Sequence, residues 1–181
     1  LKIDLFEDEV FVFTPKGDVI SLPAGSTPVD FAFAVHTDIG MHCGGARVNG
    51  KMVPLSYQLS NGEFVEILVS KNATPSQDWL HFVKTSKARS KIRGWINETR
   101  REENLNRGRE VLEREAKRLG VDLKEVTQSP RIPQVLRRYG LPDFNDLLAA
   151  LGSGRIAAGQ VVARLLGREE PARRKVRSGG S

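Results

Sequence analysis

The order of short apolar segments within residues 9–69 constrains the fold of this chain more than any other feature. Two β-rich runs flank turn residues at 15–18, which is typical of a hairpin. A helical segment follows, and then a strand, an Asn-Gly turn and a return strand. A last run rich in Val and Ile predicts a well-buried strand. The predicted strands are residues 9–14, 19–22, the two arms of 46–53, and 64–69.

The helix between these strands carries clear start signals. Thr27 is a good N-cap residue, Pro28 suits the first helical position, and Asp30 is spaced for a capping box. An apolar stripe at helical spacing comprises Val29, Ala32, Phe33 and His36, and Gly40 marks the predicted end. One helix crossing a small mixed sheet, in the order ββαββ, predicts a β-grasp, ubiquitin-like domain.

The composition changes at residues 71–76, which contain Pro, Ser, Asn and Thr and form the predicted domain boundary. After it the apolar spacing is helical. Residues 85–119 predict one or two helices, because 97–104 lack apolar side chains and Gly108 lowers helix propensity. Short helices are predicted around 135–139, 144–151 and 160–166. The whole chain is therefore expected to be α+β, with a β-grasp domain followed by an all-α domain.

Charge is distributed unevenly along the 181 residues, whose net charge is +6. Residues 1–83 carry 5 Lys/Arg against 10 Asp/Glu, residues 84–119 carry 12 against 6, and residues 120–181 carry 11 against 6. Only the second half suits a phosphate backbone, although solvated helix faces explain the same charges. No apolar run is long enough for a membrane span, no signal peptide is visible, and the single Cys suits a reducing compartment.

The richest chemistry lies in residues 34–50, with two His, the only Cys and several Gly. His36, His42 and Cys43 offer three metal ligands where structural zinc normally has four, so no metal site is expected. Cys43 lacks the positioned base of a nucleophile and is expected to be a buried packing residue. The glycines match neither phosphate-binding loop motif. No constellation of catalytic residues is predicted anywhere in the chain.

His36 allows two interpretations. As a member of the apolar stripe, it would cover the core at the helix end. At a helix terminus facing the glycine-rich loop, its ring would stack on an unpaired base, with Arg47 and Lys51 taking adjacent phosphates.

Several motifs resemble a TGS domain, as found in threonyl-tRNA synthetases, Obg-type GTPases and Rel/SpoT stringent-response enzymes. They are residues 12–32, VHTDIG at 35–40 and CGGARVNG at 43–50. The continuation is similar to the Rel/SpoT segment that joins TGS to the helical domain, at 75–80, 83–95 and 108–115. The resemblance covers residues 8–168. It implies a regulatory part of a longer enzyme, with a linker at 1–8, TGS at 9–71, a helical domain at 72–168 and a flexible basic linker at 169–181.

The resemblance also implies a function. In the Rel/SpoT family the TGS domain contacts the 3′ CCA end of deacylated tRNA in the ribosomal A site, and His36 matches the tRNA-contacting histidine. The expected 3′-end residues are His36, His42, Gly44, Arg47 and Lys51. The residues expected to contact nucleic-acid backbone are Lys84, Lys87, Arg89, Lys91 and Arg93. Steric exclusion of an esterified amino acid would discriminate between the two forms of tRNA.

The parent is expected to be a cytoplasmic GTP/GDP pyrophosphokinase, a (p)ppGpp pyrophosphohydrolase, or both, whereas this chain is expected to be non-catalytic and without cofactors. Its expected partners are deacylated tRNA, the ribosome and the catalytic domains of the parent. The alternative is a protein-interaction or autoinhibitory module. It would dock on the catalytic half, or on acyl carrier protein as some family members do, without recognising tRNA.

Overall fold

The computed structural model describes residues 8–168. Two compact units divide after Glu98, so residues 8–98 belong to the first unit and residues 99–168 to the second. The predicted flexible linker at 169–181, and all but the last residue of the predicted linker at 1–8, lie outside the described residues. The predicted domain limits at residues 71 and 72 stay a prediction. Within the described part, no helix is both long and apolar enough to cross a membrane.

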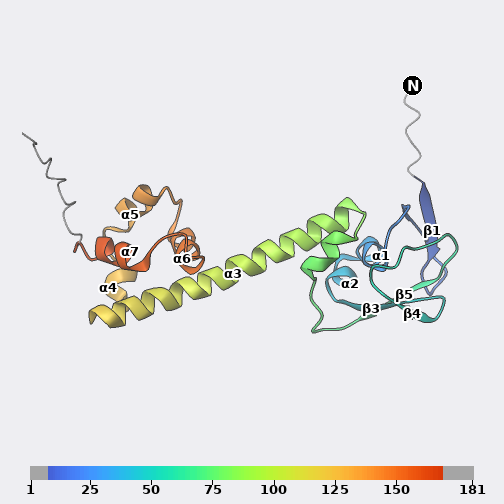
Figure 1. The fold of residues 1–181 in the computed structure, drawn as a ribbon, viewed down its shortest axis with the longest axis horizontal. Helices are drawn as coiled ribbons and strands as arrows, with labels where there is room; N and C mark the ends of the chain where they lie inside the picture. The colour runs from blue at the N-terminus through green and yellow to red at the C-terminus, as the bar shows by residue number, and fades with distance from the viewer. Residues whose placement is uncertain (1–7, 169–181) are drawn as a thin grey trace, which may run out of the picture. The chain divides into compact units, whose positions relative to one another are not determined.

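The strands of the first unit form two antiparallel groups (Figure 1). One group is a hairpin, and in the other β3 lies between β4 and β5. A parallel bridge between Phe13 and Phe64 connects the groups, and the two rings stack with centroids 5.0 Å apart. The strands are β1 (Glu9–Phe13), β2 (Val19–Pro23), β3 (Cys43–Val48), β4 (Lys51–Val53) and β5 (Val65–Val69). The predicted strand positions and the mixed α and β composition are confirmed, but the order is ββααβββ and not the predicted ββαββ.

The turn between β3 and β4 has the geometry that its sequence predicts. Asn49 and Gly50 have φ of 51° and 80°, both in the left-handed region that a two-residue type I′ turn requires. The side-chain oxygen of Asn49 also accepts a hydrogen bond from the backbone N–H of Phe64, at 2.9 Å. The turn therefore fixes the β3–β4 register and holds the start of β5.

Helix α1 (Pro28–Val35) begins as predicted. The Thr27 side chain accepts a hydrogen bond from the backbone of Asp30, the Asp30 carboxylate accepts one from the backbone of Thr27, and Pro28 occupies the first turn. This reciprocal pair is the capping box expected from the sequence.

The predicted single helix that ends at Gly40 is wrong, and so is the placement of His36 on its buried stripe. The backbone at His36 is extended, with φ −163° and ψ 144°, and a second short helix, α2 (Thr37–Met41), begins after it. Gly40 lies against the ring of Phe33, where a Cβ would come within 2.4 Å of ring carbon. The break turns α2 so that Gly40 makes this contact and the side chain of His36 faces solvent.

The last strand is less buried than predicted. Val65 is fully buried, but the flanking Phe64 and Val69 are 49% and 57% exposed. Side chains alternate across a strand, so Phe64 and Glu66 extend from the face opposite to that of the buried Val65.

The first unit continues beyond its strands. A 3₁₀-helix, η1 (Gln77–His81), which the sequence did not predict, is followed by the long helix α3 (Ser86–Leu119). Trp79 from η1 and Ile92 from α3 share a buried cluster with Phe33 of α1. The first turns of α3 therefore complete the core under α1.

The second unit is entirely helical over its described residues. Of the one or two helices predicted for residues 85–119, the structure has one, because α3 continues through residues 97–108. Ten buried side chains from α3 to α7 form the core of this unit, including Leu112, Leu147 and Val161. The remaining helices are α4 (Leu123–Thr127), α5 (Ile132–Tyr139), α6 (Phe144–Gly152) and α7 (Ala158–Leu165), of which α4 was not predicted.

Two glycines let α3 and α6 approach closely. A Cβ on Gly108 would lie 1.9 Å from the carbonyl oxygen of Leu148, and a Cβ on Gly152 would lie 1.8 Å from that of Asn104. Neither position has room for a side chain. Gly108 therefore lowers the intrinsic helix propensity of α3 but permits the backbone contact that packs α6 against it.

Candidate nucleic-acid interface

His36 occupies the junction between α1 and α2, and its side chain is exposed. Its side chain is 64% exposed, and its Nδ1 accepts a hydrogen bond from the backbone N–H of Asp38 at 3.0 Å. The ring thereby acts as the N-cap of α2. With Nδ1 as the acceptor, a neutral ring carries its proton on Nε2, which is available as a donor. Of the two interpretations of His36, the buried one is wrong.

His42 and Gly44 lie together beside the loop that follows β5. His42 is half-buried, and its Nδ1 is 3.0 Å from the carbonyl oxygen of Ala73, so Nδ1 is the donor of this bond. Gly44 lies at the irregularity in the β3–β5 ladder, and a Cβ there would be 3.3 Å from the carbonyl oxygen of Leu68 and 3.8 Å from the Cβ of Ala73. Both residues therefore help to hold this loop.

Arg47 and Lys51 lie on opposite faces of the β3–β4 hairpin. Successive side chains alternate across a strand, and the neighbours of Arg47 in the sequence, Ala46 and Val48, are buried. Arg47 therefore extends from the face that the helices do not cover, and its Nη1 is 3.8 Å from a carboxylate oxygen of Glu66 on β5. Lys51 pairs with Val48 in the register and is exposed at the hairpin end.

The five predicted 3′-end residues consequently do not converge on one pocket. His36 lies between α1 and α2, on the side of the sheet where these helices pack, whereas Arg47 extends from the other side. His42 and Gly44 form a pair of their own at the start of β3. The ring of His36 and the guanidinium of Arg47 therefore do not line one small pocket.

An apolar groove that the sequence did not reveal is lined by Val35, the residue before His36. It has a volume of about 170 Å³, and Val35 and Ile39, which flank His36 in the sequence, form one wall. Ile67 and Val69 of β5 form the opposite wall. The sequence did not predict this groove because it predicted β5 to be well buried, and a well-buried strand leaves no groove.

Cys43 is buried, as predicted, with 2% of its surface exposed. Burial raises the pKa of its thiol from 9.0 to about 11, so the thiol stays protonated and a poor nucleophile at neutral pH. Its Sγ lies 3.9 Å from the carbonyl oxygen of Gly45. Over residues 8–168, no group of three or more His, Cys, Asp or Glu side chains lies close enough to hold a metal ion.

The five basic residues around the start of α3 separate into two sets. Lys84, Arg89 and Arg93 line an open groove of about 470 Å³, and Arg89 also donates a hydrogen bond to the carbonyl oxygen of Val83 at 2.9 Å. Lys87 and Lys91 lie one helical turn apart on the other flank of α3. The buried stripe of Ala88 and Ile92 runs between the two sets.

A further basic site lies in the second unit and was not predicted. Four arginines line a pocket between α5 and α7. The sequence does contain a signal for it, because no acidic residue occurs between Glu125 and Asp143 while three arginines do. Their convergence with a fourth arginine more than 25 residues later depends on the helix packing.

Comparison with known protein families assigns both halves of the chain. The model of the TGS domain matches residues 10–69, and the model of the RelA/SpoT AH domain matches residues 95–166. The TGS match spans all five strands with α1 and α2, and thus includes His36. The AH match begins within α3 and includes the arginine-lined pocket apart from Gly167.

Curated relatives match nearly all of this chain. It is 49% identical over 170 residues to a GTP pyrophosphokinase of Myxococcus xanthus, covering 94% of this chain and 22% of that protein. It is 49% identical over 168 residues to the bifunctional (p)ppGpp synthase/hydrolase RelA of Mycobacterium tuberculosis, covering 92% and 23%. It is 45% identical over 166 residues to a GTP pyrophosphokinase of Escherichia coli, covering 90% and 22%. The chain thus spans about a fifth of the length of these relatives.

Proposed function

We propose that this chain, which carries the TGS and AH domains of the regulatory region of Rel/SpoT-type proteins, recognises the 3′ CCA end of deacylated tRNA on the ribosome. It relays the presence of that tRNA to catalytic domains in the same cytoplasmic parent protein. Relatives are named as GTP pyrophosphokinases and as a (p)ppGpp synthase/hydrolase, and we assign these activities to the parent, with a regulatory role for this region.

The observation that carries the proposal is the orientation of His36. A ring whose Nδ1 is occupied by the N–H of Asp38 has lost most of its rotational freedom before any ligand binds. Its exposed face offers a stacking surface for an unpaired base, and its Nε2 offers one donor to a base edge or a ribose hydroxyl. A preorganised contact costs less conformational entropy on binding than a flexible one.

The adjoining groove supports discrimination by size. Its volume of about 170 Å³ lies below the roughly 300–1,000 Å³ of pockets that enclose a drug-sized ligand. A single terminal group of a nucleic acid suits such a space, whereas an esterified aminoacyl group adds bulk at the same end. Exclusion of that bulk would make deacylated tRNA the preferred ligand.

The charge distribution in the first unit supports separate residues for recognising the 3′ end and for attracting the tRNA backbone. Residues 1–83 are acidic overall, so this part does not attract tRNA by net charge. The groove lined by Lys84, Arg89 and Arg93 offers cations for backbone phosphates a short distance along the chain. Recognition of the 3′ end and attraction of the backbone would thus come from different residues.

The test is binding to ribosomes that carry either deacylated or aminoacylated tRNA in the A site, using the 181-residue chain and the variant His36→Asn. Asn keeps a side-chain acceptor at the N-cap of α2 but removes the ring. We expect the unsubstituted chain to prefer deacylated tRNA and His36→Asn to lose that preference at unchanged thermal stability. The matched control is His81→Asn, which removes an exposed histidine at the end of η1.

Equal binding of both tRNA forms by the unsubstituted chain would overturn the proposal. Preference that survives His36→Asn would overturn the role of the ring. A chain that binds neither ribosomal complex but captures purified acyl carrier protein would instead support the protein-interaction alternative.

A further inference from the structure

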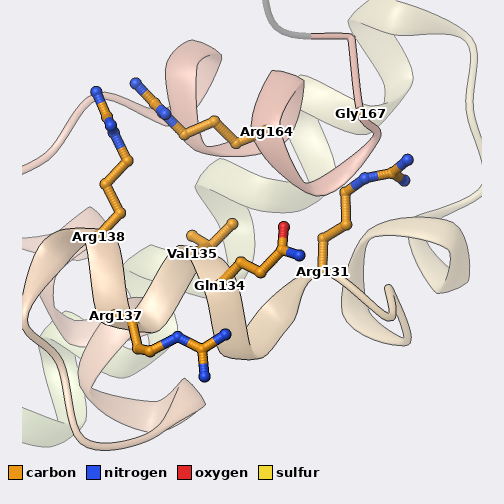
Figure 2. Close-up of a pocket in the computed structure, with 7 residues that line it drawn as sticks. All are labelled: Arg131, Gln134, Val135, Arg137, Arg138, Arg164 and Gly167. Atoms are coloured by element: carbon orange, nitrogen blue, oxygen red, sulfur yellow. The ribbon is translucent and has the colours of Figure 1, made fainter.

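Four arginines line an open pocket between α5 and α7 of the second unit, and in Figure 2 the side chains of Arg138 and Arg164 end near each other while those of Arg131 and Arg137 extend in other directions. Its volume is about 680 Å³, within the range of pockets that bind small molecules. Its charged lining residues are all arginines, and no carboxylate is among them. The lining residues are Arg131, Gln134, Val135, Arg137, Arg138, Arg164 and Gly167.

Two helices position these side chains. Gln134, Arg137 and Arg138 are spaced i, i+3 and i+4 on α5, so they extend from neighbouring turns of one helix. Arg164 comes from the last turn of α7, and its guanidinium carbon lies 6.0 Å from the centroid of the Tyr139 ring. That ring gives the cation a flat support at the α5 side of the pocket.

A buried serine fixes the two walls relative to each other. The Ser129 hydroxyl donates to the carbonyl oxygen of Leu165 at 2.6 Å and accepts from the backbone N–H of Arg131 at 3.1 Å. Ser129 is 6% exposed, so this link is shielded from water. Arg131 also lies close to Gly167, where a Cβ would be 2.5 Å from its guanidinium carbon. The start of α5 and the end of α7 are therefore held together.

Helix stabilisation alone does not explain these charges. Arg137 and Arg138 lie in the last turn of α5, where cations interact favourably with the helix dipole. Arg131 is at the opposite end, where a cation is unfavourable, and α5 has neither a side-chain N-cap nor an acidic residue in its first turn. Within residues 8–168, Arg131, Arg137 and Arg138 form no ion pair. Arginine stays charged at neutral pH, so a bound anion would reduce their mutual repulsion.

We propose that this pocket binds a ligand with two or more closely spaced phosphate groups. The planar guanidinium forms paired hydrogen bonds with phosphate oxygens, and several guanidiniums around one cavity suit a polyanion better than a single carboxylate. A free diphosphate compound and an RNA backbone both supply this chemistry. The site shares no residue with the His36 surface and does not depend on the function proposed for it.

The test is titration of the 181-residue chain with inorganic pyrophosphate and, separately, with a 12-base-pair RNA duplex. The pocket variant is Arg137→Gln/Arg138→Gln. The matched control is Arg114→Gln/Lys117→Gln, which removes two exposed positive charges from α3 in the same unit. We expect at least one probe to bind, with its affinity reduced more than about tenfold in the pocket variant and less than about twofold in the control. Equal circular dichroism spectra and melting temperatures would establish that both variants fold.

A second substitution separates a shaped site from general positive charge. Arg131→Lys keeps the charge but removes the planar guanidinium, so we expect about a threefold or greater loss of affinity for the probe that binds. Pocket-dependent binding of pyrophosphate alone identifies a free diphosphate compound as the ligand, and pocket-dependent binding of the duplex alone identifies an RNA backbone. Binding of neither probe, or equal losses in the pocket variant and the control, would overturn the proposal.

Discussion

The two units hold α3 against a neighbouring segment by opposite means. In the first unit, the carboxylate of Asp30, which is fully buried, accepts hydrogen bonds from backbone and hydroxyl groups of Thr27 and Thr85 and from the backbone of Lys84. These bonds connect the start of α1 with the start of α3. In the second unit, Gly108 and Gly152 bring the backbones of α3 and α6 into direct contact.

The difference predicts how each unit fails. Hydrogen bonds that share the Asp30 carboxylate are all lost when that acceptor is removed, because several buried donors are then left without partners. A close backbone contact is lost when an atom is added, because nothing nearby can move away cheaply. The first unit should therefore lose stability when the carboxylate of Asp30 is removed. The second unit should lose stability when a side chain is added where α3 contacts α6. Both Trp residues, Trp79 and Trp95, lie in the first unit, so fluorescence follows that unit separately.

The largest effect is expected for Asp30→Ala. It removes the acceptor of all these bonds, and we expect the free energy of unfolding of the first unit to fall by about 3–5 kcal/mol. Urea unfolding followed by tryptophan fluorescence measures this change. The comparison variant is Asp143→Ala, which removes the local cap of α6, where Asp143 accepts from the backbone of Asp146 at 2.8 Å. We expect a loss of about 1 kcal/mol there, measured by circular dichroism at 222 nm because neither Trp lies in the second unit. Equal losses at both sites would contradict the central role of Asp30.

The next largest effect is expected for Gly108→Ala. The added methyl group would collide with the carbonyl of Leu148, and we expect the second unit to lose about 2–3 kcal/mol. The control lies in the same helix, because a Cβ on Gly94 meets nothing within 4 Å. Gly94→Ala should instead stabilise α3 by about 0.5–1 kcal/mol. Thermal unfolding followed by circular dichroism at 222 nm measures both changes, and effects of the same sign would contradict the proposed contact.

These two sites also mark the limit of sequence-based inference for this chain. The capping box of Thr27 and Asp30 depends on residues three apart, and the sequence predicted it correctly. The bonds from Asp30 to Lys84 and Thr85 span more than 50 residues, and no local pattern indicates them. From the sequence alone, Gly108 indicated only a lower helix propensity. The backbone of α6, which leaves no room for a side chain at this position, is distant in the sequence.

The candidate interface was predictable to a similar extent. The resemblance to TGS domains singled out His36, but the apolar stripe allowed it to cover the core at the end of a helix that was predicted to end at Gly40. The packing of Gly40 on Phe33, which breaks that helix, has no signature in the apolar spacing. The separation of Arg47 from His36, by contrast, was accessible from the sequence, since the alternation around Arg47 already indicated that it points away from the core.

A smaller effect is expected from Cys43, again in the first unit. Because burial raises the pKa of its thiol to about 11, the folded state favours the neutral thiol, whereas the unfolded chain ionises near pH 9. The resulting stabilisation is complete below about pH 9 and is lost as the pH rises towards about 11, with a change on the order of 1–2 kcal/mol. Urea unfolding at several pH values, compared with Cys43→Ala, isolates this contribution. Parallel pH profiles for the two proteins would contradict it.

The smallest effect on stability is expected for Arg47→Gln. Its partner Glu66 is 3.8 Å away, and both side chains are more than 40% exposed, so the ion pair should contribute less than about 0.5 kcal/mol.

The substitution Arg47→Gln is more informative about binding. Arg47 extends from the opposite side of the sheet to His36, so its loss should not change the preference for deacylated over aminoacylated tRNA. If Arg47 contacts a phosphate elsewhere on the ligand, the loss lowers affinity for both tRNA forms equally and makes binding less dependent on salt. A loss of preference equal to that of His36→Asn would mean that the two faces read the same end of the tRNA, and the separation of recognition from charge within the first unit would then be wrong.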